Sequence, residues 1–434
     1  MQRISDLKST PELWDVAVIG GGPAGMMAAG RAAALGASVV LLEKNKTLGK
    51  KLLITGGGRC NVTNNEPDTR KLLAKFKDGG KFLASPFSQW SVGESLDFFH
   101  TRGMPTKVEA AQRVFPLSNT AQSVRDVLVD YLQKTGVTVL SNAAVVKLHT
   151  DGNHIVSAEL KNGTTIRARS FILATGGTSH PETGSTGDGY AWLRELGHTV
   201  IDASAALVPV ALRSPAKGAA GAALPDAKIT LYQNEARQAQ ARGKILFTHV
   251  GLSGPGILNM SREIGELLKY GDVAIEIDLL PDMGYEKVNA ALQDILKENS
   301  NKMLKNSLKE ILVPALVAPV LDAAAIDPEL FCNSVTREAR VRLMKTVKHW
   351  RFDVKELLGM DKAVITAGGI ALSEVDFKSM RSSRYANLFL VGDILNIDRP
   401  SGGYSLQLCW TTGFVAGSAA AALSAGSAQK RQVD

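Results

Sequence analysis

The sequence predicts an α/β fold in which a doubly wound, Rossmann-like domain carries an inserted β-rich unit and a helical subdomain. Residues 15–45 read as a strand, a glycine-rich turn, a helix and a second strand, which is the βαβ unit of a dinucleotide-binding domain. Further apolar strands that end in glycine turns occur at 170–177 and 387–394. Because such strands lie at both ends of the chain, we expect the middle to be an insertion.

The turn of the βαβ unit has the G-x-G-x-x-G spacing at Gly20, Gly22 and Gly25. Gly20 permits the tight turn, Gly22 lets a pyrophosphate approach the backbone, and Gly25 lets the helix pack against the strand. The helix N-terminus then offers free N–H groups and a positive dipole end to the phosphates. Glu43 ends the second strand, where an acid can accept hydrogen bonds from ribose hydroxyls. Pro23 and Ala24 complete the expected cofactor-binding turn.

Residues 51–64, KLLITGGGRCNVTN, place three consecutive glycines before an arginine, a cysteine and an asparagine. Adjacent glycines are costly to order, so we expect them where a ligand approaches the backbone. No second cysteine lies nearby, which favours Cys60 as a compact contact residue, with a redox role as the alternative. The residues expected to meet the cofactor here and in the preceding basic loop are Lys44, Lys51, Gly57, Gly58, Arg59, Cys60 and Asn61.

Two later segments favour FAD over NAD as the dinucleotide. The strand at 387–394 ends in Gly392 and Asp393, and a carboxylate at a strand end suits a ribityl hydroxyl, although it can also cap a helix. A small-residue helix follows, and its N-terminus suits the pyrimidine edge of a flavin. The other expected contacts are Ala174, Thr175 and Gly176 after the strand at 170–177, and Gly402, Gly403, Tyr404 and Gln407 at the start of the helix.

Length and composition indicate a globular protein of two or three domains. The chain has 434 residues, of which 45% are hydrophobic and 21% charged, so a disordered class is excluded. Three cysteines without a C-x-x-C motif argue against a disulfide framework and for a reducing compartment. We see neither a signal peptide nor an apolar run of about 18 residues. We therefore expect a cytoplasmic protein with no membrane partner and no metal site.

Six segments in order along the chain resemble one protein family. They are VIGGGPAG, KLLITGGGRCNVTN, LATGGTSHPETGSTGDGYAW, LFTHVGLSGPGIL, ITAGGI and LVGDILNIDRPSGGYSLQLCWTTGFVAG, and they fall between residues 18 and 417. Together they resemble the FAD-dependent oxidoreductases known as BaiN-type, YhiN-like or aminoacetone-oxidase-like. The resemblance implies FAD as the cofactor, an oxidoreductase activity and a glutathione-reductase-like FAD domain with the same three-part plan.

The periodicity of the middle segment sets the expected domain boundaries. We assign 1–205 and 355–434 to the FAD-binding domain. Residues 206–282 alternate in places and read as a β-rich unit, and 283–354 have helical spacing. We expect the substrate to bind between the flavin and this insertion, because ligands of such folds bind at the carboxyl ends of the strands.

Two histidines are candidates for the proton donor of a flavin reaction. His180 is either a general acid or a loop residue packed beside Pro181. His249 is a second acid candidate, or it belongs to a structural hinge with Gly251 and its neighbours. No second G-x-G-x-x-G marks an NAD(P) domain, so NAD(P)H is expected at most as a transient reductant.

A basic segment at 337–351 leaves nucleic acid open as a partner. It holds six Lys or Arg side chains against the single acid Glu338, and Trp350 is available to stack on a base. The bland alternative is a solvated helix face, and the net charge of +8 fits either. The sequence thus leaves three hypotheses: an enzyme that reduces a C=C bond or oxidises an amine or alcohol in a small molecule, an enzyme that reduces a uracil of ribosomal RNA to dihydrouridine, and a non-catalytic flavin-binding protein.

Overall fold

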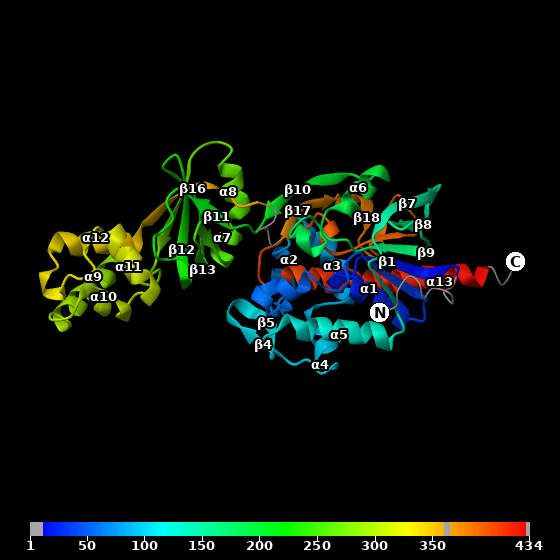
Figure 1. The fold of residues 1–434 in the computed structure, drawn as a ribbon, viewed down its shortest axis with the longest axis horizontal. Coiled ribbons are helices and arrows are strands. Elements are labelled where there is room, and N and C mark those ends of the chain that lie inside the picture. The colour runs from blue at the N-terminus through cyan, green and yellow to red at the C-terminus, as the bar shows by residue number, and fades with distance from the viewer. Residues whose placement is uncertain (1–11, 360–364, 431–434) are drawn as a thin grey trace. The chain divides into compact units, whose positions relative to one another are not determined.

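A computed structural model describes residues 12–359 and 365–430, and the chain forms two compact units (Figure 1). The first unit comprises the described residues of Met1–Ser204 and Ile365–Asp434, and the second those of Ala205–Val364. Each unit has its own hydrophobic core. Residues 360–364, which directly precede the ITAGGI segment, lie outside the described residues.

A nine-stranded sheet forms the centre of the first unit, as the βαβ pattern predicts. Its path runs β18-β19-β20-β9-β1-β2-β6, and the five strands from β20 to β6 pair in parallel. An antiparallel hairpin, β7 and β8, extends from β9. The strands are β1 (Trp14–Ile19), β2 (Val39–Glu43), β6 (Thr138–Ser141), β7 (Val145–Asp151), β8 (His154–Leu160), β9 (Thr165–Leu173), β18 (Val375–Asp376), β19 (Arg381–Ser382) and β20 (Leu388–Leu390).

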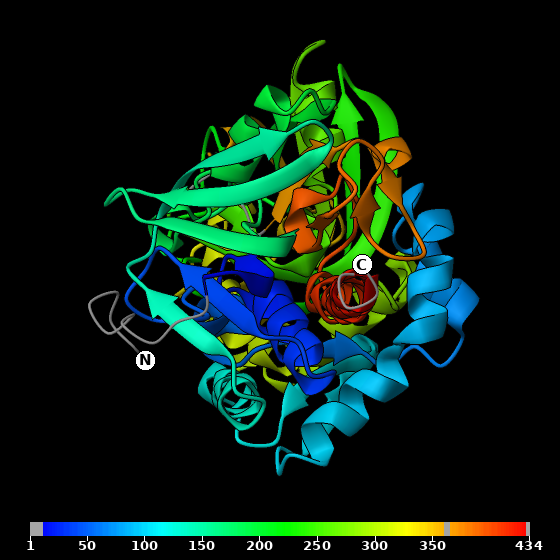
Figure 2. The ribbon, with the colours of Figure 1, turned by 90° about the vertical axis from the view of Figure 1, so that its right-hand side faces the viewer.

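Helices α1 (Pro23–Ala34) and α13 (Tyr404–Lys430) pack side by side against this sheet (Figure 2). Small residues allow the close approach: a Cβ added to Gly413 would lie 2.5 Å from the Ala24 carbonyl oxygen, and one added to Gly417 would lie 2.4 Å from that of Ala28. The other helices of the unit are α2 (Thr69–Ala74), α3 (Gly79–Gln89), α4 (Val92–His100), α5 (Ala121–Lys134) and α6 (Asp188–Glu195).

The segment Tyr404–Gly426 of α13 is apolar and long enough to cross a membrane by length and composition, which the sequence reading did not anticipate. Of its most apolar window, 67% is buried inside the protein. A core helix of a globular domain passes the same test, and the packing on α1 accounts for the apolar composition.

Two small sheets complete the first unit. One pairs β3 (Thr63–Asn64), β5 (Arg113–Pro116) and β4 (Thr106–Glu109), and the other pairs β10 (Val200–Ala206) with β17 (Ile365–Ile370). The first of these sheets borders the glycine-rich segment of residues 51–64, so it bears on the candidate site.

The second unit is a closed antiparallel barrel with helices packed on it. The strand order is β11-β14-β13-β12-β15-β16. The strands are β11 (Val210–Leu212), β12 (Ala223–Gln233), β13 (Ala236–Phe247), β14 (Gly251–Ser253), β15 (Val273–Asp278) and β16 (Trp350–Leu357). The helices are α7 (Pro255–Leu258), α8 (Ser261–Leu267), α9 (Tyr285–Glu298), α10 (Leu304–Ser307), α11 (Pro314–Ala323) and α12 (Arg337–Lys348).

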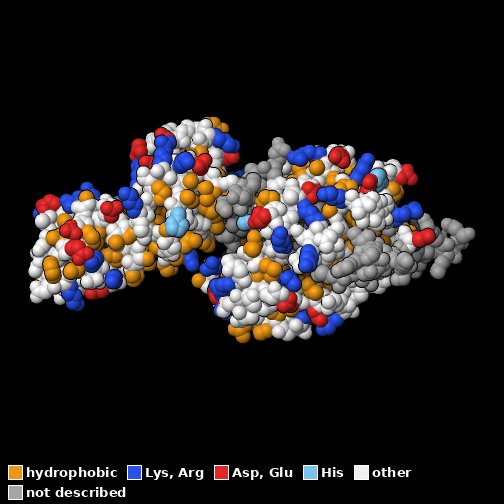
Figure 3. All heavy atoms as spheres, in the orientation of Figure 1, with side chains coloured by type: hydrophobic (Ala, Val, Ile, Leu, Met, Phe, Trp, Pro, Cys, Tyr) orange, Lys and Arg blue, Asp and Glu red, His pale blue; other side chains and the backbone are white. Residues whose placement is uncertain are grey.

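The basic segment at 337–351 is less available than the sequence indicates, and the prediction that Trp350 can stack on a base is wrong. Trp350 begins β16, is 6% exposed and packs on Phe247 and Phe352. Lys348 is also buried, in an ion pair with Asp278 at 2.7 Å. In the face shown in Figure 3, basic and acidic side chains are interspersed rather than gathered in one basic patch.

Candidate functional site

The glycine turn after β1 packs tightly against the end of β9. Gly20 has φ +107°, and a Cβ there would lie 2.5 Å from the Ala174 carbonyl oxygen. A Cβ on Gly25 would lie 1.9 Å from the Gly20 oxygen, so α1 starts directly on the turn. Both positions therefore need glycine for packing, which places the predicted residues Gly20, Gly25 and Ala174 together.

Gly22 differs from its neighbours because it faces open space. It precedes α1 with φ −79°, no side chain caps the helix there, and a Cβ would meet no atom within 4 Å. Ala24, two residues further along, lies close to the turn after β20. A Cβ added to Gly392 of that turn would lie only 3.0 Å from the Ala24 Cβ. The uncapped N-terminus of α1 thus opens beside the Gly392–Asp393 turn, where an anionic group would be stabilised.

Glu43 at the end of β2 holds the glycine turn in place. One carboxylate oxygen accepts from the Gly21 N–H at 2.8 Å, and the other accepts from the Asn45 N–H at 2.7 Å and the Asn45 side-chain amide at 2.8 Å. A carboxylate accepts about four hydrogen bonds, so capacity for a further donor remains. The Asn45 amide also donates to the Thr183 carbonyl at 3.0 Å, a link that sequence reasoning missed.

A cluster of charges lies near the carboxyl end of β20. Arg399 donates to one Asp393 carboxylate oxygen, and the Lys51 ammonium lies 3.9 Å from the other. Lys51 also donates to Ser179 Oγ at 2.5 Å. Arg399 is buried and further donates to the Ile397 carbonyl at 2.6 Å and to Ser405 Oγ at 3.0 Å. Two cations surround one carboxylate here, which favours an additional negative charge nearby.

Burial governs the proton affinities around this cluster. Burial lowers the pKa of Lys51, and the Asp393 carboxylate opposes that shift. Burial, and to a lesser extent the Asp393 carboxylate, raise the pKa of the Cys409 thiol to about 12. Sequence reasoning named Lys51 and Asp393 but missed Arg399, whose only signal was a basic residue next to the Gly402–Gly403 turn.

The segment 51–64 forms an irregular helix, η2 (Leu52–Gly58), whose glycines are exposed. Gly56, Gly57 and Gly58 all have positive φ angles, of 57°, 68° and 82°. A Cβ on Gly57 would meet no atom within 4 Å, so the backbone is open to a ligand there. Cys60, two residues after these glycines, is fully buried with φ 60°, and burial raises the pKa of its thiol to about 12.

Three predicted contact residues are engaged elsewhere. Arg59 lies 4.1 Å from the Phe115 ring centroid and pairs with Glu109. Lys44 forms an ion pair of 2.8 Å with Asp188. The buried Gln407 donates to the Ser91 carbonyl, Ser95 Oγ and Thr411 Oγ1, and its carbonyl accepts from Thr63.

The Gly402–Gly403 turn packs on β3 rather than standing open. A Cβ on Gly403 would lie 2.3 Å from the Thr63 carbonyl carbon, and the Asn64 amide donates to the Gly402 carbonyl at 3.0 Å. Tyr404, the first residue of α13, is buried. These glycines therefore have a packing function that does not depend on a ligand.

The two candidate acids occupy different units. His180 has φ 53°, an uncommon conformation for a residue other than glycine, and its Nδ1 lies 2.9 Å from Glu182 Oε1. Its neighbour Ser179 accepts from Lys51, so the loop borders the charge cluster. His249 is exposed in the turn between β13 and β14 of the second unit.

The residues of the first unit fit a dinucleotide such as FAD. Open space adjoins Gly22 and Gly57, and the charge cluster has an excess of positive charge. Two side-chain oxygens, Asn61 Oδ1 and Thr175 Oγ1, are buried without a hydrogen-bond partner, and both belong to predicted contact residues. Buried polar atoms are nearly always bonded, so these two point to a missing polar ligand.

Comparisons with known proteins agree with this description. The family described as HI0933-like protein Rossmann domain matches residues 14–419. A 3-dehydro-bile acid delta(4,6)-reductase of Clostridium scindens is 31% identical over 94% of this chain and 98% of its own length. A ribosomal RNA dihydrouridine synthase of Escherichia coli is 29% identical over 92% of this chain and 96% of its own length.

Solved structures share the fold at low sequence identity. The 3-ketosteroid-delta4-(5alpha)-dehydrogenase of Rhodococcus jostii has a TM-score of 0.54 at 17% identity, covering 97% of this chain and 99% of its own. An open flavocytochrome c3 fumarate reductase has the same TM-score and identity, covering 97% of this chain and 80% of its own. The predicted α/β Rossmann-like fold is thereby confirmed.

Proposed function

The chain belongs to the HI0933-like Rossmann family of FAD-dependent oxidoreductases, and from this premise we propose that it reduces a carbon–carbon double bond conjugated to a carbonyl group. One observation carries the proposal. Two relatives that match nearly the whole chain are named for different substrates, a 3-dehydro bile acid and ribosomal RNA. Both names describe saturation of a C=C bond that a carbonyl activates, in the bile acid and in uracil.

We propose that the first unit holds FAD along the residues described above. The N-terminus of α1 at Gly22 would face the pyrophosphate, and Glu43 would accept from the ribose hydroxyls while it holds the turn. Asp393 would accept from a ribityl hydroxyl, with Lys51 and Arg399 balancing its charge. When bound and reduced by two electrons, for which NAD(P)H is the proposed donor, the flavin would supply the hydride that one carbon of the double bond receives.

The second carbon needs a proton, for which we propose His180. Its ring is held by Glu182, a pair that fixes the imidazole orientation as a general acid requires. The uncommon φ of His180 costs free energy and is the kind of strain found at functional sites. His249 is the other candidate, and His180 is preferred because it shares a unit with the glycine turn and the charge cluster.

A uracil in ribosomal RNA is the second candidate substrate, supported by the synthase relatives. Exposed Arg337 and Lys345 on α12 offer cations for phosphate contacts.

We also propose NAD(P)H as the reductant. Its binding would be transient, because the sequence holds no second dinucleotide fingerprint. The cytoplasm is the proposed compartment, since Cys60, Cys332 and Cys409 are all free thiols.

The deciding experiment compares the two substrate classes, one with the purified protein and the other with a strain that lacks the gene. A 3-oxo-Δ4 steroid is offered to the reduced enzyme anaerobically, and flavin reoxidation is followed by absorbance. In parallel, ribosomal RNA from a strain lacking the gene is mapped by mass spectrometry for lost dihydrouridine. Reoxidation by the enone with unchanged RNA supports a small-molecule enzyme, and a lost dihydrouridine supports the RNA enzyme. If neither occurs, and anaerobic NADH and NADPH leave the flavin oxidised, the non-catalytic hypothesis replaces both.

A further inference from the structure

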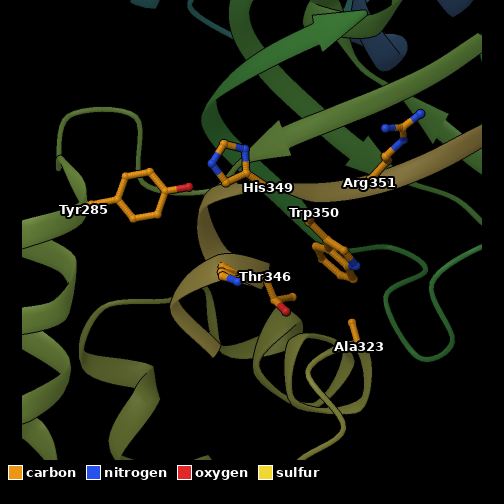
Figure 4. A pocket seen from close by; sticks show the side chains of 7 residues that line it. Tyr285, Ala323, Thr346, His349, Trp350 and Arg351 are labelled. Atoms are coloured by element: carbon orange, nitrogen blue, oxygen red, sulfur yellow. The ribbon is translucent and has the colours of Figure 1, made fainter. Parts of the chain in front are cut away.

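A pocket of about 460 Å³ opens on the second unit, at the end of the basic segment 337–351 (Figure 4). It lies where the start of α9 and the end of α12 meet the beginning of β16. The size falls within the range of ligand pockets, which hold about 300–1,000 Å³. The pocket is lined by Tyr285, Ala323, Lys345, Thr346, His349, Trp350 and Arg351.

An exposed aromatic pair forms one side of the pocket. Tyr285 is 45% exposed and stacks on His349, with ring centroids 5.5 Å apart and planes at 28°. His349 Nδ1 lies 2.9 Å from Glu276 Oε1, which holds the imidazole in place. Figure 4 shows the Tyr285 ring projecting from the start of α9 toward His349. The pair offers a fixed aromatic surface to a planar group, which the buried Trp350 cannot do.

The charges around the pair leave one cation free for a ligand. Arg351 is neutralised, because its guanidinium pairs with Glu235 through two hydrogen bonds. Lys345 is exposed on α12 four residues before His349, and no ion pair to it is seen within the described residues. The N-terminus of α9, which begins at Tyr285, has no side-chain cap, and its first turn carries the acid Glu286, so the cation available to a ligand here is Lys345. A planar group and one adjacent anion would therefore be recognised together.

We propose that this pocket binds an unpaired nucleotide of an RNA, with its base on Tyr285 and its phosphate at Lys345. The inference rests on the RNA substrate proposed above and assigns to the second unit a contact outside the flavin site. A nucleotide combines a flat aromatic face with one phosphate per residue, which matches this lining. A neutral or carboxylated sterol lacks the planar aromatic face.

The test measures binding of full-length, FAD-loaded protein to total bacterial ribosomal RNA over a range of salt concentrations. Tyr285→Ala is expected to weaken binding about 5- to 100-fold, and Tyr285→Phe, which keeps the ring, to bind like the unmodified protein. Lys345→Ala is expected to reduce the magnitude of the negative slope of log affinity against log salt concentration by about 0.7, because one phosphate contact is lost. Lys297→Ala, an exposed lysine at the far end of α9, is the matched charge control. Flavin absorbance confirms in each variant that the first unit is intact.

The outcomes distinguish failure of the pocket inference from failure of the proposed RNA substrate. Binding by the unmodified protein that Tyr285→Ala and Lys345→Ala leave unchanged overturns the pocket inference and leaves the RNA substrate standing. Equal losses in Lys345→Ala and Lys297→Ala would show a diffuse charge effect and also overturn it. If the unmodified protein binds no RNA at low salt, both the RNA substrate and the pocket inference fail, while reduction of a small enone is unaffected.

Discussion

The guanidinium of Arg399 donates to the carboxylate of Asp393 although the Arg399 side chain has no exposed surface. Such a charge is stable inside a protein only if its hydrogen bonds are satisfied, and Ile397 and Ser405 accept two of them. Asp393 is in turn shared with Lys51. An ionic cluster therefore holds the turn after β20 together.

Removal of Arg399 should weaken the first unit strongly. Arg399→Met leaves Asp393 with only the more distant Lys51, and breaking a buried pair costs about 3–5 kcal/mol of unfolding free energy. Urea unfolding of the apoprotein measures this loss. The double variant Arg399→Met/Asp393→Asn should recover part of it, because the uncompensated Asp393 carboxylate is removed, while Lys51 loses its ion-pair partner. A single-variant loss below about 1 kcal/mol would show that the pair contributes little.

Substitution of two glycines of the same turn by alanine should affect different properties, protein stability for Gly25 and FAD affinity for Gly22. Gly25→Ala places a methyl group 1.9 Å from the Gly20 oxygen, so overpacking of about 1–3 kcal/mol outweighs the helix propensity that alanine gains. Gly22→Ala meets open space and should change the unfolding free energy by less than about 1 kcal/mol. If the pyrophosphate lies there, Gly22→Ala nevertheless lowers FAD affinity about tenfold or more. Calorimetry and flavin titration separate the two effects, and a Gly22→Ala variant with unchanged FAD affinity would contradict the proposed site.

The βαβ unit could be predicted from sequence because its signals are local. The two strands expected within residues 15–45 correspond to β1 and β2, and Gly20 and Gly25 lie where the spacing indicates. Side-chain partners far apart in the chain could not be predicted. Arg59 bonds to Asn119, sixty positions away, through the β3–β5–β4 sheet, and Trp350 became a barrel strand residue because the basic helix ends at Lys348.

His198 should make the stability of the first unit depend on pH. Burial lowers its pKa from the ordinary 6.5, and Arg384 lowers it further, while Glu374 opposes the shift. The unfolded chain therefore binds a proton more readily, so stability is complete above about pH 6.5 and falls as the pH drops toward the lowered value. His198→Phe should flatten this dependence, which is at most about 1.4 kcal/mol per pH unit for one proton.

Thermal unfolding between pH 5 and 8 tests the assignment to His198. The His198 ring lies tilted against Tyr385, with ring centroids 5.8 Å apart, and its Nε2 lies 2.8 Å from Ser382 Oγ. When His198 is replaced, Ser382 Oγ still accepts from the backbone N–H groups of Arg384 and Tyr385. Replacement of His154, which is exposed at the start of β8, is the control and should leave the pH profile unchanged. An equally steep profile in His198→Phe would assign the acid sensitivity to other groups.

Cys60 should behave as a structural residue despite its place in the glycine-rich segment. It is fully buried and its pKa is raised to about 12, so almost no thiolate exists at neutral pH. Iodoacetamide should modify it at pH 8 only after the protein is unfolded, as peptide mapping would reveal. Cys60→Ser should retain FAD and its reduction rate, at a modest cost in stability from the buried hydroxyl. Within the described segment 51–64 there is no second cysteine to form a redox pair with Cys60. A Cys60→Ser variant that keeps FAD but can no longer be reduced would instead place the thiol in the electron path.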